Sequence, residues 1–361
     1  MTTIDDLARA LGAEAVGEGG LVVTGAAEPA SAGPDDIALA MQPAFAEDLG
    51  RGAARAAILW PGADWQALGL EAAILAPRAR YLLAGVNRVF ERPPELAPGI
   101  HPSAVIDPTA EVPADAAIGP FVLVGPRVRI GAGARIFSHV SIAEDAEIGR
   151  DALLLSGVRI GARVRIGDRF IAQPGAVLGA DGFSFVTPTR GLVEEARETG
   201  VVTAEEQDEY VRINSIGSVR IGDDVEVGAN SCIDRGTVAD TTIGDGTKID
   251  NLVQLGHNVK VGRTCLICGH VAVGGSTVIG DRVVLGGKAA VADHLTIGQN
   301  SVITGNSGVA SNVPPNRIMM GYPAVRMDQN VEIYKALRRL PRFMARLDAV
   351  QKGISNPSPT D

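Results

Sequence analysis

Histidine is the side chain best suited to move protons near neutral pH, and two of the five histidines in this chain have a spacing that suggests chemistry. His294 follows His257 by 37 residues, and Gly275 follows it by 18. In a coil with 18 residues per turn, these three positions would stack along one edge. There, His257 could take a proton from a nucleophile, and a glycine N–H could bind an oxyanion. Alternatively, corner histidines would only hydrogen-bond a neighbouring subunit.

The other three histidines give a weaker signal. His270 follows His257 by 13 residues, which places it at a different corner of such a coil. His139 lies beyond interruptions of the repeat, so the spacing does not fix its edge, and we assign no role to His101.

An aliphatic residue at every sixth position defines the elements that would hold these residues. Ile, Leu or Val fills 13 of the 14 positions from Ile100 to Leu178, and all 12 positions from Ile243 to Val309. A period of six fits neither an α-helix nor an ordinary strand. The residue four places later is often small, as at Ala134, Ala146, Thr247, Cys265 and Ser301.

This period predicts a three-sided parallel β-helix of about ten coils, with the aliphatic and the small residues inside. A glycine often follows the aliphatic residue, as at Gly119, and we expect it to ease the tight corner. The register breaks at 179–220, and again between Ile233 and Ile243, where four extra residues are inserted. Loops that leave a regular scaffold are often functional, although these two could also be decorative.

The chain is expected to have three parts. Residues 1–99 lack the repeat and alternate apolar runs with Ala-rich stretches, which predicts a small α/β domain. Residues 100–313 form the β-helix, and residues 314–361 form a C-terminal helical extension with a break at Pro341. That extension could dock an acidic partner, or it could be a solvated or self-associating helix. Its positive charge is concentrated at Arg326, Lys335, Arg338, Arg339, Arg342 and Arg346.

The bulk composition argues against several classes of protein. A net charge of −9 and a pI of about 5.2 do not suit a general nucleic-acid binder. Cys265 and Cys268 form a C-x-x-C without a second pair to complete a zinc site, so we expect buried thiols and no metal. The N-terminal sequence does not resemble a secretory signal, and no apolar run is long enough for a transmembrane segment. A cytoplasmic location is expected.

Three stretches carry a resemblance to a known family. They are GADGFSF at 179–185, CIDRGTVADTTIGDGTKIDNLVQLGHNVKVG at 232–262 and ADHLTIG at 292–298. With the hexad coil, they resemble the UDP-3-O-acylglucosamine N-acyltransferases of lipid A biosynthesis, which belong to the left-handed β-helix acyltransferases. The resemblance implies a left-handed parallel β-helix and a homotrimer with active sites between subunits.

The resemblance also implies a reaction. A 3-hydroxyacyl chain would move from acyl carrier protein to the 2-amino group of UDP-3-O-(3-hydroxyacyl)-glucosamine. Phosphopantetheine would arrive on the acidic carrier protein, which we expect to dock near the basic C-terminal segment, and no other cofactor would be needed. His257 would be the general base, His294 an auxiliary residue, and the Gly275 N–H the oxyanion donor.

Substrate-binding residues are implied in two regions. Asp250 and Asn251 precede His257 by seven and six residues, so they should reach its groove only across a subunit boundary and line the sugar site there. Asn258 is a further candidate beside the base. In the N-terminal domain, Phe45 would stack on uridine and Gln42 would offer a polar contact.

Three alternatives differ in testable ways. The sister O-acyltransferase of the same pathway shares the coil and a histidine base, but it lacks the N-terminal domain and the IDRG and GADGF stretches. A zinc enzyme on this coil needs three converging histidines, whereas only two share an edge here. A non-enzymatic β-helix predicts flat, repetitive faces without inserted loops.

Overall fold

The computed structural model describes residues 1–203, 209–321 and 324–355. The chain divides into two compact units, Met1–Glu95 and Leu96–Asp361. Each unit has its own apolar core.

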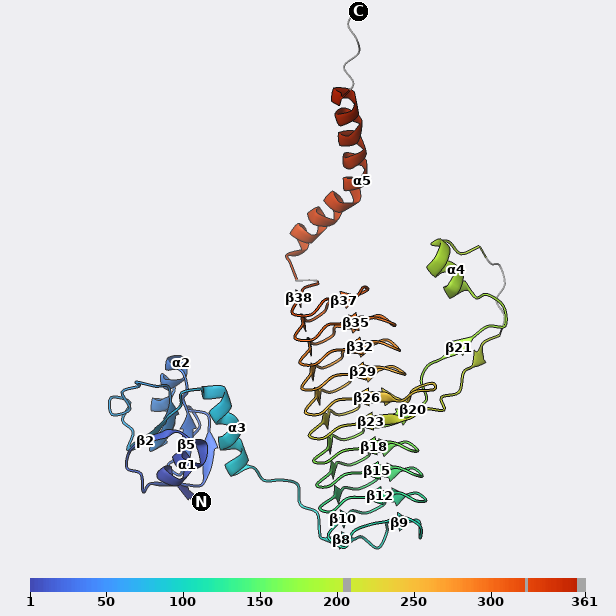
Figure 1. The fold of residues 1–361 in the computed structure, drawn as a ribbon. Helices are drawn as coiled ribbons and strands as arrows, with labels where there is room; N and C mark the ends of the chain where they lie inside the picture. Colours follow the sequence, from blue (N-terminus) through green and yellow to red (C-terminus); the bar gives the residue numbers. More distant parts are fainter. Residues whose placement is uncertain (204–208, 322–323, 356–361) are drawn as a thin grey trace, which may run out of the picture. The chain divides into compact units, whose positions relative to one another are not determined.

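The first unit, whose helices α1, α2 and α3 are labelled in Figure 1, is an α/β fold. It is built on a five-stranded sheet in the order β2-β7-β6-β5-β4. The pairs β4-β5, β5-β6 and β6-β7 are parallel, and β2 adds an antiparallel edge. Alternate residues of the central strands enter two separate apolar clusters, as expected for a sheet covered on both faces. The elements are β1 (Thr2–Thr3), α1 (Ile4–Leu11), β2 (Glu14–Gly17), β3 (Val22–Val23), β4 (Gly25–Ala27), β5 (Asp36–Leu39), α2 (Pro43–Ala46), the 3-10 helix η1 (Leu49–Arg51), β6 (Ala56–Leu59), β7 (Ala72–Leu75) and α3 (Ala79–Phe90).

The second unit is the predicted left-handed parallel β-helix. Its three faces contain eleven, ten and eight strands in the described residues, and neighbouring rungs within a face pair in parallel. Away from the interruptions, partners are 18 residues apart, as for Ile118 and Ile136. The predicted three-sided winding is therefore confirmed.

The strands of the three faces follow in chain order. The first face contains β8 (Gly99–Ile100), β10 (Ala117–Ile118), β13 (Arg135–Ile136), β16 (Leu153–Leu154), β19 (Ile171–Ala172), β24 (Glu226–Val227), β27 (Lys248–Ile249), β30 (Leu266–Ile267), β33 (Val284–Leu285), β36 (Val302–Ile303) and β38 (Ile318–Met319). The second face contains β9 (Val105–Ile106), β11 (Leu123–Val124), β14 (Ser141–Ile142), β17 (Arg159–Ile160), β20 (Val177–Ala180), β25 (Cys232–Asp234), β28 (Gln254–Leu255), β31 (Ala272–Val273), β34 (Ala290–Val291) and β37 (Gly308–Val309). The third face contains β12 (Arg129–Ile130), β15 (Glu147–Ile148), β18 (Arg165–Ile166), β23 (Val219–Ile221), β26 (Thr241–Ile243), β29 (Lys260–Val261), β32 (Val278–Ile279) and β35 (Thr296–Ile297).

The interior of the coil has the composition that the period predicts. Aliphatic residues from Ile118 to Val309 fill it, while Ile100 on the first rung is 53% exposed. The small residues four places later are all fully buried: Ala134, Ala146, Thr247, Cys265 and Ser301.

At the corners, the structure differs from the expectation that glycine eases the tight turn of the backbone. Three places after the inward aliphatic residue, the backbone is commonly left-handed, and non-glycine residues such as His294 occupy it with φ near 59°. Glycines directly after the aliphatic residue have another role. A Cβ on Gly149 would lie 2.4 Å from the carbonyl carbon of Gly167 on the next rung. Close stacking of rungs, and not corner conformation, therefore requires glycine there.

Two loops leave the coil on adjacent rungs. The long one lies between β20 and β23 and contains the antiparallel pair β21 (Phe185–Val186) and β22 (Val211–Arg212), together with α4 (Leu192–Thr199). The short one lies between β25 and β26. Because β20 pairs with β25, both loops begin at neighbouring strand ends of the second face.

After the last rung, the chain forms helix α5 (Met327–Ser355). We expected Pro341 to break this segment, but the helix continues through it and bends partway along its length (Figure 1). Across the described segments, the helices are either too short or too polar to span a lipid bilayer.

Candidate active site

His257, Gly275 and His294 lie on one edge of the coil, at the corner that follows the second face. They come directly after β28, β31 and β34, which are successive neighbours in the sheet. The N–H of Ser276 donates to the His257 carbonyl at 2.8 Å, and the N–H of His294 donates to the Gly275 carbonyl at 2.9 Å. The stacking predicted from the spacing is confirmed by this register.

The imidazole of His257 is enclosed by two glycines. A Cβ on Gly275 would lie 2.7 Å from Nε2, and a Cβ on Gly182 would lie 2.7 Å from the histidine Cβ. Gly275 belongs to the next rung, whereas Gly182 comes from the long loop. Both positions need glycine because any side chain would collide with the ring, and neither has a positive φ that would itself require it.

The other ring nitrogen is held from the short loop and from the coil. Nδ1 lies 3.1 Å from Asn258 Oδ1 and 3.4 Å from Thr237 Oγ1. An Nδ1–H donated to the Asn258 oxygen leaves Nε2 with its lone pair, the tautomer that a general base requires. Gly275 packs against this side of the ring, where an added Cβ would lie 2.7 Å from both Nε2 and Cε1.

Asn258 also holds the short loop in place. Its Oδ1 accepts the Thr237 N–H at 3.0 Å, and its Nδ2 donates to the Ala239 carbonyl at 2.8 Å. The residue sits in the left-handed corner position with φ 62°, which asparagine tolerates well. Its role as a substrate ligand remains a prediction, and its side chain already positions Thr237 and His257.

A cavity of about 480 Å³ opens in front of the His257 ring. Phe183 and Phe185 of the long loop also line an adjoining cavity of about 530 Å³. Both interruptions of the repeat therefore meet at this histidine, which favours a functional origin over a decorative one. The residues around the first cavity are Asp181, Gly182, Phe183, Phe185, Arg212, Asp234, Gln254, Gly256, His257 and Gly275.

Asp234 is a site residue that the sequence analysis missed. It ends β25 and is only 9% exposed, yet it lines the same cavity as His257. Burial raises the pKa of its carboxyl group, while a hydrogen bond from Gln254 and the positive charge of His257 oppose that shift. The signal was available in the sequence. Ile233 and Leu255 are separated by one 18-residue turn plus the four inserted residues, and they pair in the sheet. Asp234 directly follows Ile233.

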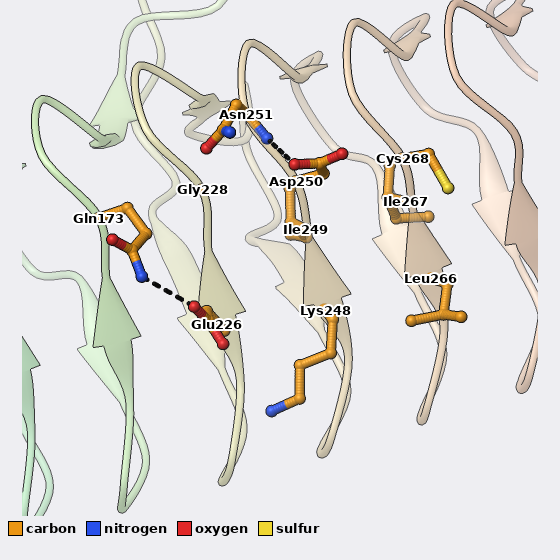
Figure 2. A pocket seen from close by; sticks show the side chains of 10 residues that line it. All are labelled: Gln173, Glu226, Gly228, Lys248, Ile249, Asp250, Asn251, Leu266, Ile267 and Cys268. Atoms are coloured by element: carbon orange, nitrogen blue, oxygen red, sulfur yellow. Dashed lines mark hydrogen bonds between the residues drawn. The ribbon is translucent and has the colours of Figure 1, made fainter. Parts of the chain in front are cut away.

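Asp250 and Asn251 follow β27 on the first face, and they line a separate cavity of about 490 Å³ (Figure 2). Asp250 Oδ2 accepts the Gly269 N–H at 2.8 Å, and Asn251 Oδ1 accepts the Ala229 N–H at 2.6 Å. Within one chain these two residues therefore lie at a different corner from His257, as their spacing predicts.

The remaining histidines lie away from this edge. His139 and His270 both follow first-face strands and occupy left-handed corner positions. The ring of His139 packs on Phe121 with centroids 5.1 Å apart, and His101 Nδ1 lies 2.9 Å from Ser103 Oγ.

The N-terminal candidates lie on the short helix α2 and at its start. Gln42 is the residue before the helix, and Phe45 is 49% exposed and therefore available for stacking. All three cysteines are free thiols, and no group of three or more His, Cys, Asp and Glu in the described ranges could hold a metal ion.

Comparison with known proteins gives family matches on the coil and relatives along the whole chain. Residues 100–183 match a family model described as the GMPPB C-terminal domain, and residues 240–275 match one described as bacterial transferase hexapeptide (six repeats). An Arabidopsis UDP-N-acetylglucosamine acyltransferase structure covers 62% of this chain and 71% of its own, with a TM-score of 0.52 and 22% identity. That likeness concerns the fold alone.

Relatives of higher identity share one name, UDP-3-O-acylglucosamine N-acyltransferase. The protein from Ruegeria pomeroyi is 59% identical over 99% of both chains. The protein from Paracoccus denitrificans is 61% identical over 74% of this chain and 73% of its own. The protein from Burkholderia multivorans is 45% identical over 98% and 97%.

The hexapeptide coil, with a histidine enclosed at one corner, defines an acyltransferase of the left-handed β-helix class. Within that class, the chain belongs to the UDP-3-O-acylglucosamine N-acyltransferase family.

Proposed function

We propose that this chain transfers a 3-hydroxyacyl group from the thioester of acyl carrier protein to the 2-amino group of UDP-3-O-(3-hydroxyacyl)-glucosamine, in lipid A biosynthesis. The observation that supports this mechanism most directly is the close packing of Gly275 against the imidazole of His257, where an added Cβ would lie 2.7 Å from Nε2. His257 and Gly275 also line the same cavity, so the proposed proton acceptor and the proposed backbone donor are both accessible to one bound substrate.

His257 acts as the general base. The sugar amine attacks the thioester carbon, and Nε2 accepts a proton from the nitrogen as the C–N bond forms. The tetrahedral intermediate then collapses, the C–S bond breaks, and the imidazolium returns its proton to the departing pantetheine sulfur. The products are the amide and the free carrier thiol, and no metal is needed to balance the step.

The Gly275 N–H stabilises the oxyanion of that intermediate. Within the described residues, this N–H donates to no protein acceptor, so it is free for a ligand. A backbone donor beside the base would act mainly when charge develops on the oxygen. His294, one rung further on the same edge, is proposed as an auxiliary contact to the carrier arm or the acyl hydroxyl.

The site is proposed to be completed by a second copy in a homotrimer. Asp250 and Asn251 follow the first face, whereas His257 follows the second, so one chain cannot bring them together around a sugar. A neighbouring copy would present its first-face corner to the His257 cavity. For the nucleotide, Phe45 is proposed to stack on the uracil ring and Gln42 to contact it.

Acyl carrier protein, which is acidic, is proposed to dock on the basic face of α5. Arg339, Arg342 and Arg346 are exposed, are spaced by three and four residues, and have no ion-pair partner in the described residues. Residues at that spacing share one helical face.

The test is formation of the amide from purified components, measured by mass spectrometry with acyl-carrier thioester and the free-amine UDP-sugar. His257→Ala should lower turnover by about 10²–10⁴-fold, the usual contribution of a general base. His101→Ala, at the first rung of the coil and far along the sequence from the proposed sugar site, should leave turnover near that of the parent. A loss smaller than about tenfold in His257→Ala, or acylation of UDP-N-acetylglucosamine instead, would refute the proposal.

A further inference from the structure

We propose that Asp234 is a positioning residue whose carboxylate stabilises the imidazolium form of His257 while the amide bond forms. The inference rests on the proposed role of His257 as the base. It concerns a buried acid that the mechanism above does not use.

The strand register places Asp234 beside the histidine. Cys232 and Ile233 pair with Gln254 and Leu255, so Asp234 comes level with Gly256, one residue before His257. Gly256 has no side chain, which leaves the space between the carboxylate and the ring open to the shared cavity. Asp234 and His257 therefore occupy neighbouring rungs at the same corner.

The burial of Asp234 follows from the long loop. On its other side, Asp234 pairs with Ala180, the last residue of β20. The chain then continues through Asp181 to Gly182, which packs against the His257 ring. The start of the loop thus runs from the rung of Asp234 to the histidine, where it shields the carboxylate from solvent. A charge in such surroundings acts more strongly on its neighbours than an exposed one.

The other charged groups around the cavity do not replace this carboxylate. Asp181 and Arg212 form an ion pair of 3.9 Å, and both side chains are about half exposed, so solvent screens them. Arg235 directs its guanidinium to the carbonyls of Ala162 and Gly179 on earlier rungs. No lysine or arginine in the described part of the chain forms an ion pair with Asp234.

The pKa values of two groups in this region, the Cys232 thiol and the Asp234 carboxyl, are both raised. Burial and the negative charge of Asp234 raise the pKa of the Cys232 thiol, so this thiol stays neutral. Burial raises the pKa of Asp234 itself, but the Gln254 hydrogen bond and a positive His257 lower it. A positively charged His257 therefore favours the ionised form of Asp234, so the carboxylate is most stable as an anion when the imidazolium has formed.

This interaction should appear in kcat and not in KM. The attraction between carboxylate and imidazolium arises only after the proton has moved, so it lowers the energy of the transition state relative to the bound substrates. Without it, Nε2 accepts the amine proton less readily, while sugar and carrier bind as before.

The experiment is a double-mutant cycle on the full-length protein with Asp234→Asn, His257→Ala and the pair. Asn keeps the shape and can still accept from Gln254, and Asp281→Asn is the matched control on the third face. We expect Asp234→Asn to lower kcat by at least about tenfold, a barrier change of about 1.4 kcal/mol, with KM within about twofold. In the His257→Ala background, the same substitution should change the rate by less than about twofold.

Two results would overturn the inference alone: a kcat within about twofold of the parent, or an equal loss in the His257→Ala background, which would indicate a role independent of the base. Near-parental turnover in His257→Ala itself would instead refute the proposed function and this inference with it. Thermal unfolding reports whether each variant is folded. If Asp234→Asn does not fold, Asp234→Ser must show the same dependence on His257.

Discussion

The backbone of Gly275 lies so close to the imidazole of His257 that an added methyl group would approach Nε2 to 2.7 Å. The contact joins two successive rungs at one corner of the coil. Both residues line the same cavity.

A first prediction concerns this contact. Gly275→Ala should push the His257 ring from its position and lower kcat by at least about tenfold, because a misplaced base loses much of its 10²–10⁴-fold effect. The backbone itself should not be strained, since the glycine has no positive φ, so any loss of stability should come only from the displaced ring. The control is Gly287→Ala, at the equivalent place after the first face, where a Cβ would meet only the Gly269 carbonyl at 3.5 Å. Steady-state kinetics would contradict the prediction if both variants had the same kcat.

A second prediction separates positioning from substrate binding at Asn258. Asn258→Ala removes the acceptor beside Nδ1 and the ties to Thr237 and Ala239, so we expect kcat to fall about tenfold or more with a smaller change in the KM for the sugar. The loss of stability should be about 1–2 kcal/mol, from the lost hydrogen bonds and the left-handed backbone.

Asn306→Ala is the matched control for that measurement. Asn306 is another left-handed corner asparagine, with φ 58°, and it lies at the corner after the first face. It should lose stability but keep its kinetics. A selective rise in KM in Asn258→Ala, with kcat preserved, would instead favour the predicted role as a substrate ligand.

A third prediction concerns acid stability. Asp168 and Asp281 each accept the backbone N–H of an arginine one rung earlier at 2.8 Å and also pair with that arginine's side chain, which lowers the pKa of both carboxyls. A carboxyl whose folded pKa lies below its unfolded value, near 4, stabilises the fold above that value. The stabilisation is lost as the pH falls through the folded pKa.

Thermal unfolding between pH 7 and pH 2.5 provides the measurement. The melting temperature of the parent should fall below about pH 4, and the double variant Asp168→Asn/Asp281→Asn should show a flatter acid limb. Identical slopes would show that these rung-to-rung contacts do not set the acid sensitivity.

A fourth prediction concerns the proposed carrier site on α5. Reversing the charges of Arg339, Arg342 and Arg346 to Glu should raise the KM for acyl carrier protein about tenfold or more and leave kcat at saturation unchanged. Added salt should raise the KM of the parent and affect the variant less. Arg80→Glu, an exposed arginine in the first unit, is the control.

The oligomeric state of that variant must be measured by light scattering. Exposed apolar residues of α5, among them Ile333, Leu337, Leu340, Met344 and Leu347, recur at alternating intervals of four and three, a spacing that also suits packing between copies. A parental KM in a variant of unchanged oligomeric state would place the carrier elsewhere.

The period of six was enough to predict the three-sided coil, its buried small residues and the shared edge of His257, Gly275 and His294. Each rung repeats the same local geometry, so the number of a residue in the sequence determines its rung and its corner. The same counting separated Asp250 from that edge. The period gave a wrong reason for the glycines that follow the aliphatic residues. We expected the corner conformation to require them, whereas close contacts between rungs do, and a local pattern does not show such contacts.

The surroundings of His257 were decided only by the tertiary structure. Gly182, Thr237 and Asp234 meet His257 where loops of irregular length leave and rejoin the coil. A loop has no period, so its path depends on side-chain packing and on hydrogen bonds such as those of Asn258. The sequence therefore determined which edge carries the histidine, and the folded chain determined which ring nitrogen meets Asn258 and which buried acid lines the same cavity.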